Sequence, residues 1–162
     1  MMKRFYSKKP QHGVAAVEFG ILIVPLLLML LALFEYGRAI YQYNTLVKSV
    51  RYASRYLTAV APGNTANEWD KARCLVRYGN TSCAGNLLVP GLTAAMVTIC
   101  DSTNCADTHA AVATTEGVVN LVTVDVQGFQ FQSLFNFTIG GLNIGAPDIT
   151  FDAIGNTMRQ VL

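Results

Sequence analysis

The chain has 162 residues, of which 52% are hydrophobic and only 14% are charged, and its formal net charge is +2. This length leaves room for one membrane helix and one small domain, but not for two domains. The skew toward hydrophobic residues is largely explained by a single apolar segment near the N-terminus.

Residues 1–13 form a short basic leader. It has no acidic residue and carries four positive side chains, Lys3, Arg4, Lys8 and Lys9. Such a tail could suggest nucleic-acid binding, but four positive charges before a membrane span more often determine topology, so we expect no nucleic-acid partner. The positive-inside rule places the leader in the cytoplasm and the C-terminal part of the chain outside it.

Residues 14–35 are predicted to form a transmembrane helix, because this length suits a hydrocarbon core of about 30 Å. Glu18 is the only charged residue between Val14 and Phe34. A carboxylate in such a span costs roughly 2.5–3.5 kcal/mol on insertion scales, so its presence needs a reason. Either Glu18 lies close enough to the cytoplasmic interface to stay hydrated, or it meets a positive charge. A cleaved secretory signal is the rival interpretation, but the apolar run is long for one and no clear small-residue cleavage site follows it.

The helical pattern continues beyond the membrane over residues 36–61. Apolar or small residues recur at alternating steps of four and three, which predicts one stripe of an amphipathic helix that packs against a sheet. The stripe consists of Tyr36, Ile40, Tyr43, Val47, Val50, Ser54 and Leu57. Pro62, Gly63 and Asn64 then give a turn signal, so we expect the helix to end near Ala61.

Residues 62–162 are predicted to form a small α+β head. A capping-box pattern at Thr65–Glu68 opens a short helix that Gly79 can close. Strands are expected at 95–100, at 118–131 with a bulge at Gly128, and near 148–153, while the glycine-rich run 140–145 is expected to be a loop. The fold class is therefore α+β: a long N-terminal helix followed by a short helix and an antiparallel sheet.

Four cysteines, Cys74, Cys83, Cys100 and Cys105, fall in this head. Four cysteines allow three pairings, and sequence proximity favours Cys74–Cys83 and Cys100–Cys105. An alternative metal site would use Cys100, Cys105 and His109, with Asp107 as a further ligand. Its spacing matches no common zinc pattern, and an oxidising compartment favours disulfides, so we expect no metal and no other cofactor.

We expect no catalytic residues. Histidine occurs only at positions 12 and 109. The chain shows no nucleophile elbow, no phosphate-binding loop and no suitably spaced pair of carboxylates.

A more specific signal comes from residues 13–57. Gly13 precedes the apolar run and Glu18 is the fifth residue after it, a spacing that resembles the processing site of type IV prepilins. The wider pattern resembles the N-terminal signature of TadE-like proteins, which are minor pilins or pseudopilins of the tight-adherence (Tad) pilus system. The residues that carry it are Gly13, Ala15, Ala16, Val17, Glu18, Phe19, Pro25, Glu35, Gly37 and Arg38. Phe19 stands where the major Tad pilin usually has Tyr.

The resemblance implies a pilin-like protein of the bacterial inner membrane, with a periplasmic head and a place in a surface pilus. A prepilin peptidase would cut between Gly13 and Val14, while Glu18 and Phe19 would serve assembly. The implied partners are other pilins and pseudopilins, the pilus assembly platform and the membrane, and the implied role is to initiate, cap or build the pilus. The alternative is an uncleaved single-pass envelope adaptor whose head binds a soluble partner.

Overall fold

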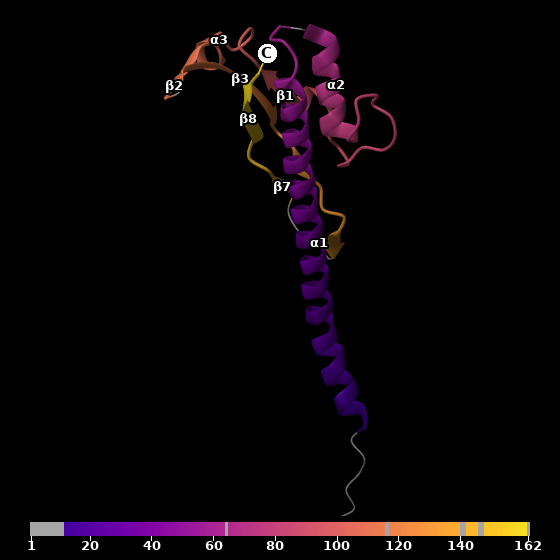
Figure 1. The fold of residues 1–162 in the computed structure, drawn as a ribbon. Helices are drawn as coiled ribbons and strands as arrows, with labels where there is room; N and C mark the ends of the chain where they lie inside the picture. Colours follow the sequence, from indigo (N-terminus) through magenta and orange to yellow (C-terminus); the bar gives the residue numbers. More distant parts are fainter. Residues whose placement is uncertain (1–11, 64, 116, 140–141, 146–147, 162) are drawn as a thin grey trace, which may run out of the picture.

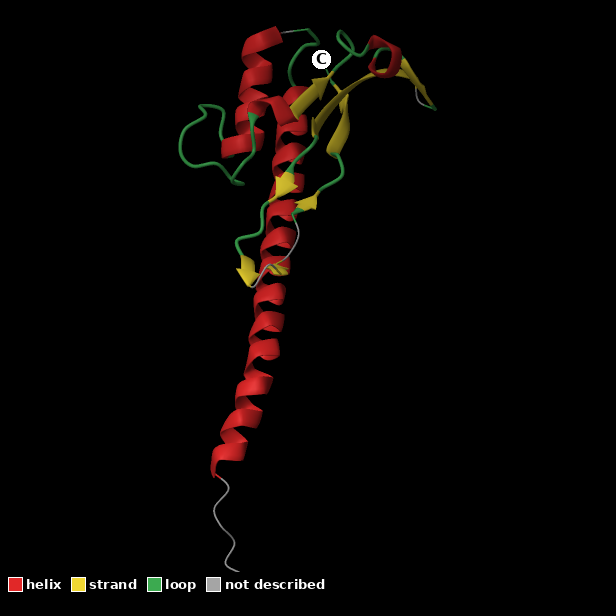
Figure 2. Cartoon of the chain, turned by 180° about the vertical axis from the view of Figure 1, so that it is seen from behind, coloured by secondary structure: helices red, strands yellow, loops and turns green. Residues whose placement is uncertain are grey.

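The computed structural model describes residues 12–63, 65–115, 117–139, 142–145 and 148–161. One long helix runs most of the length of the molecule, and the other elements lie beside or beyond its C-terminal half (Figure 1). The N-terminal half of this helix extends alone below the head (Figure 2). This is the α+β arrangement expected from the sequence, whereas most of the leader lies outside the described residues.

The long helix α1 spans His12–Thr58 and continues through Pro25. Its 47 residues correspond to about 70 Å at a rise of 1.5 Å per residue. It ends slightly before the expected Ala61, because the amide groups of Ala59 and Val60 bond the carbonyl oxygens three residues earlier. This tighter last turn satisfies carbonyl groups that a regular helix end leaves free.

The second helix, α2 (Thr65–Tyr78), packs beside the upper part of α1 (Figure 1). The carboxylate of Glu68, expected to serve a capping box, accepts hydrogen bonds from the Tyr56 hydroxyl and from Lys71 Nζ. It therefore links α2 to α1. Two short helical segments complete the helices of the described residues: η1 (Ala94–Met96) and α3 (Ala106–His109).

The main sheet is built around β3 (Gly117–Val126). Its second half pairs antiparallel with β1 (Val97–Cys100) on one side and with β8 (Ile154–Gln160) on the other, and its first three residues pair with β2 (Val112–Thr114). Two smaller pairs follow β3: β4 (Gln130–Phe131) with β7 (Ile149–Thr150), and β5 (Asn136–Ile139) with β6 (Leu142–Gly145).

One hydrophobic core lies between α1, α2 and the sheet. The alternation along β3 places Val122, Val124 and Val126 in this core, as the period of two predicts. Opposite them lie Leu46, Val50, Ala53 and Leu57 of α1, together with Ala72 and Val76 of α2. The head is thus fixed to the upper half of α1 by apolar packing, which is the main stabilising term in such a domain.

The predicted stripe on α1 is correct near the core and wrong near the membrane. Val50, Ser54 and Leu57 are buried, but Tyr36, Ile40 and Tyr43 are exposed. The buried face there runs through Glu35, Ala39 and Gln42 instead. A hydrophobicity pattern misses this face because Glu35 is buried through hydrogen bonds from Arg38 and from the amide of Leu134.

The strands after β3 also differ from the prediction. The chain leaves β3 at Gly128, whose φ of 68° lies in the left-handed region that favours glycine, so the strand breaks there instead of forming a bulge. The glycine-rich run 140–145, expected to be a loop, contributes β6, although Gly140 and Gly141 lie outside the described residues. The last strand is β8, six residues later than expected, while the predicted segment contains only the short β7.

Candidate functional site

The free half of α1 is an apolar surface. The helix is long and apolar enough to cross a membrane, and its most hydrophobic window has a mean hydropathy of 2.7 with none of it buried. In the part of the chain that the structure describes, it is the one helix with these properties. Large apolar side chains are exposed all around it: Val14, Val17, Phe19, Ile21, Leu22, Val24, Leu26, Leu27, Leu28, Met29, Leu30, Leu33 and Phe34. Such a surface fits a single-pass membrane protein.

The expected processing and assembly residues all lie at the start of this surface. Gly13 and Val14 are in the first turn of α1, and both are exposed. Glu18 follows Val14 by four residues, so the two lie on the same face one turn apart. Glu18 and Phe19 are exposed, and Glu18 has no hydrogen-bond or ion-pair partner among the described residues. A partner for this carboxylate would therefore have to come from outside the described residues.

A second acidic residue of α1, Glu35, is buried and has hydrogen-bond partners, unlike Glu18. Its side chain is only 3% exposed, and it accepts hydrogen bonds from Arg38 Nη2 at 2.8 Å and from the amide of Leu134 at 3.3 Å. Arg38 Nη2 also donates to the main-chain oxygen of Gln132 at 2.6 Å. Below, the "Glu35–Arg38 clamp" means these two side chains with residues 131–134.

The Glu35–Arg38 clamp is completed by an aromatic contact. The guanidinium carbon of Arg38 lies 4.3 Å from the ring centre of Phe131, a distance suited to a cation–π interaction. The clamp thus joins the top of the apolar span to a head segment about a hundred residues later. From the sequence, Glu35 and Arg38 have no predicted role beyond their place in the N-terminal signature. Their spacing of three on a helix was a signal for an ion pair, but nothing in the sequence indicated the loop that meets them.

Both disulfides in the head join cysteines that are close in sequence. Cys74 is bonded to Cys83 and Cys100 to Cys105, which is the pairing that proximity favours. The first ties the C-terminal part of α2 to the loop that follows it. The second closes the turn between β1 and α3.

The possible metal ligands are brought together but are otherwise engaged. Atoms of Cys100, Cys105 and His109 lie within 4.8 Å of one another, yet the two sulfurs form a disulfide. His109 Nε2 lies 2.7 Å from the Thr123 hydroxyl, and its Nδ1 lies 2.7 Å from that of Thr108. The cluster therefore binds one part of the head to another, and thiolate ligands would exist only after reduction of the bond.

Asp101 organises the loop closed by the second disulfide. It is 2% exposed and accepts hydrogen bonds from the amides of Gly63, Thr103 and Asn104 and from the Thr103 hydroxyl. Burial by itself would raise the pKa of Asp101, but these hydrogen bonds together outweigh it and hold the pKa below its usual value. The carboxylate therefore connects this loop to the turn after α1.

A second partly buried carboxylate, Asp125, lies in β3 beside β8. Its register partner in β8 is Gly155, where a Cβ atom would lie only 1.9 Å from the carboxylate oxygen. Burial raises the pKa of Asp125, and the nearby His109 opposes this effect. A side chain at position 155 would displace the Asp125 carboxylate, which occupies the space above Gly155.

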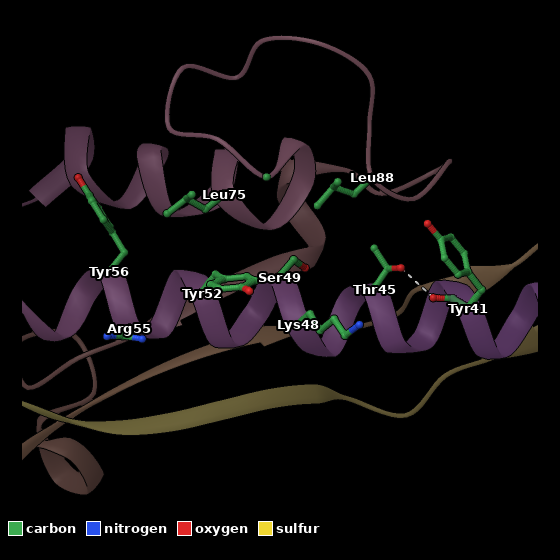
Figure 3. A pocket seen from close by; sticks show the side chains of 10 residues that line it. Tyr41, Thr45, Lys48, Ser49, Tyr52, Arg55, Tyr56, Leu75 and Leu88 are labelled. Atoms are coloured by element: carbon green, nitrogen blue, oxygen red, sulfur yellow. Dashed lines mark hydrogen bonds between the residues drawn. The ribbon is translucent and has the colours of Figure 1, made fainter.

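A groove of about 780 Å³ lies between α1 and α2 (Figure 3). Lys48, Tyr52 and Arg55 come from α1, whereas Leu75 comes from α2 and Leu88 from the loop after it. The hydroxyl of Tyr56, also on the wall, donates to Glu68, and this hydrogen bond raises the pKa of Tyr56. Among the residues that line the groove none is a carboxylate, a histidine or a thiol.

Residues 13–55 match the model of the TadE-like protein family. No curated protein and no solved structure matches the chain. The matched stretch contains the apolar span, Glu18 and both side chains of the Glu35–Arg38 clamp, whereas the sheet and both disulfides lie beyond it. The similarity to TadE-like proteins therefore covers the anchor of this chain and most of the helical spine above it.

Proposed function

We propose that this protein is a minor pilin or pseudopilin of a Tad-type pilus, with a structural rather than an enzymatic role. The observation that carries the proposal is the family match over residues 13–55 on a helix whose N-terminal half is apolar and uncovered. A subunit that assembles through its N-terminal helix needs such a surface. The head would then be presented outside the membrane on the upper half of α1.

In the proposed assembly the chain inserts in the inner membrane with its leader in the cytoplasm and its head in the periplasm. A prepilin peptidase removes residues 1–13 and leaves a new α-ammonium group on Val14. The carboxylate of Glu18 lies one helical turn away from that residue, so it can pair with the ammonium of its own chain or of a neighbouring pilin. Because a bare carboxylate in hydrocarbon is costly, the pairing favours association of the helices side by side.

Two features of the chain support a periplasmic location for the head. The head contains two disulfides, Cys74–Cys83 and Cys100–Cys105, and such bonds form and persist in oxidising compartments. The basic side chains of the leader precede the span in the sequence, and the positive-inside rule then favours a cytoplasmic leader and a periplasmic head. The partners in this proposal are other pilins and pseudopilins and the pilus assembly platform.

The N-terminus of the mature protein tests the proposal directly. We expect intact-mass and N-terminal peptide analysis of the membrane-purified chain to show a first residue of Val14. Replacement of the small residue at the cleavage site, in Gly13→Leu, should leave the leader attached, because the peptidase must admit the backbone at that point. The matched control is Gly20→Leu, since Gly20 lies in the same helix and a Cβ atom there also meets open space.

An uncleaved wild-type chain would contradict the pilin proposal and favour a single-pass envelope adaptor whose head binds a soluble partner. Normal maturation of Gly13→Leu would instead show that cleavage occurs elsewhere or by another enzyme.

A further inference from the structure

The segment that follows β4 lacks charged residues and forms a hairpin, and the pilin proposal assigns no role to either property. From residue 126 to residue 147 the chain contains no Asp, Glu, Lys, Arg or His. Within this stretch β5 and β6 form an antiparallel hairpin with apolar residues at Phe137, Ile139, Leu142 and Ile144 of the sequence. A charge-free stretch of this length, with apolar residues at alternate positions of a hairpin, is uncommon on the surface of a soluble domain.

The Glu35–Arg38 clamp determines where this hairpin begins. Glu35 binds the amide of Leu134, two residues before β5, and Arg38 binds the carbonyl of Gln132. The rings of Phe34 and Phe135 meet edge to face with 6.5 Å between their centres. The start of the hairpin is thus at the height of residues 34–35 of α1.

That height coincides with the end of the membrane span. A helix needs about 20 residues to cross a hydrocarbon core of about 30 Å, so a span that begins at Val14 ends near Phe34. In Figure 2 a pair of strands lies beside α1 at the lower end of the head, next to the free half of the helix. The hairpin therefore lies where the outer surface of the bilayer would be.

The exposed side chains on this level are apolar and adjoin the anchor. Leu134 is 68% exposed and Phe34 63% exposed, whereas the carboxylate of Glu35, which binds the amide of Leu134, is buried. The exposed apolar surface of α1 therefore continues onto the head. Tyr36 is also exposed close by, as is common for aromatic residues at a membrane interface. Lipid that covers the anchor would extend over this continuous surface.

We propose that the head touches the bilayer itself: Leu134, Phe135 and the β5–β6 hairpin rest in the outer interface of the membrane that α1 spans. The Glu35–Arg38 clamp would hold them at that depth, so the head would have a fixed height and orientation above the lipid. This inference rests on the membrane anchor of the proposed function, and it does not depend on cleavage or on a pilus.

Quenching of tryptophan emission by brominated lipid tests the contact in the full-length chain. The chain has one tryptophan, Trp69 in α2, so Trp69→Phe gives a silent background. Single tryptophans are then introduced as Leu134→Trp, as Leu27→Trp in the span, and as Val118→Trp, an exposed position in β3 at the far end of the head. Each variant is reconstituted in vesicles of dioleoylphosphatidylcholine or its dibrominated form, so dilute that most vesicles hold a single chain.

We expect brominated lipid to remove most of the emission of Leu27→Trp, a clear part of that of Leu134→Trp, and essentially none of that of Val118→Trp. Gln132→Trp gives a second position in the same loop, since Gln132 contacts Arg38 through its main chain and its side chain is exposed. Disulfide mapping of each variant checks that the head has folded.

The proposal is overturned if Leu134→Trp and Gln132→Trp both keep their emission as Val118→Trp does, while Leu27→Trp is quenched. Loss of quenching at Leu27→Trp as well would contradict the membrane anchor on which the proposed function also depends. The two failures are therefore distinguishable in one set of samples.

Discussion

Arg38 Nη2 lies 2.6 Å from the main-chain oxygen of Gln132, 94 residues further along the chain. The same nitrogen bonds the buried carboxylate of Glu35, so one guanidinium connects the top of the apolar span to the lower end of the head. The contact is polar and lies below the hydrophobic core, where α1 would otherwise leave the head.

We expect Arg38→Ala to destabilise the head by about 3 kcal/mol, because removal of one partner leaves the Glu35 charge buried and uncompensated. The double variant Glu35→Leu, Arg38→Leu should lose less than Arg38→Ala, since no lone charge remains. Chemical unfolding in detergent micelles, followed through the emission of Trp69, measures the change.

The control for the clamp is Arg51→Ala, because Arg51 lies on the same helix with an exposed side chain. This substitution should change the free energy of unfolding by less than about 0.5 kcal/mol. Equal stability of Arg38→Ala and Arg51→Ala would show that the clamp does not hold the head to α1.

Glu18 should matter for association and not for folding. Glu18→Ala removes a carboxylate without a partner among the described residues, so insertion and the disulfide-bonded head should remain intact. We expect recovery of partner pilins from matched membranes to fall by roughly tenfold, which corresponds to about 1.4 kcal/mol. Co-purification of the tagged chain measures this recovery.

Leu22→Ala serves as the matched control for Glu18, since Leu22 is exposed one turn further along the same face. If Glu18→Ala recovers as much partner pilin as the wild type, the pairing proposal is wrong, and Glu18 is a hydrated residue at the cytoplasmic interface.

The disulfides should stabilise the head to different extents. Their cysteines are separated by 9 and 5 residues. On the chain-entropy model, loss of Cys74–Cys83 should cost about 2.5 kcal/mol and loss of Cys100–Cys105 about 2 kcal/mol. Paired Cys→Ser variants in the unfolding experiment test this ranking. Non-reducing peptide mapping checks the pairing, and four free thiols or a crossed pairing would contradict it.

Stability at low pH should depend on Asp101. Its pKa in the folded head lies below the unfolded value, so its contribution is fully present above the unfolded pKa and is lost as pH falls through the folded pKa. At pH 7, Asp101→Ala should cost about 2 kcal/mol, because buried amide donors lose a charged acceptor. The difference from wild type should shrink toward pH 3 in unfolding curves measured across this range.

Asp107→Ala provides the comparison for Asp101, since Asp107 is an exposed acid in the nearby helix α3. A pH dependence shared by both variants would mean that general charge effects, and not the hydrogen bonds to Asp101, are responsible.

Local sequence determined the elements whose signals are periodic and strong. The apolar run after Gly13 predicts the free half of α1, because an apolar segment long enough to cross a membrane is most often a transmembrane helix. The alternation of Val122, Val124 and Val126 predicts the buried face of β3. Short separations predict the disulfide pairs, because nearby residues meet often in any conformation of the chain.

Only the tertiary structure decided the face that α1 presents to the head below the core. Sequence periodicity favoured Tyr36, Ile40 and Tyr43 there, whereas the structure buries Glu35, Ala39 and Gln42. A polar residue reads as exposed in any hydrophobicity pattern, and Glu35 becomes buried only because Arg38 and the amide of Leu134 compensate its charge. Arg38 lies one turn away on α1, but the amide of Leu134 comes from the loop after β4, whose position depends on the whole packed head. No local pattern could have placed that loop.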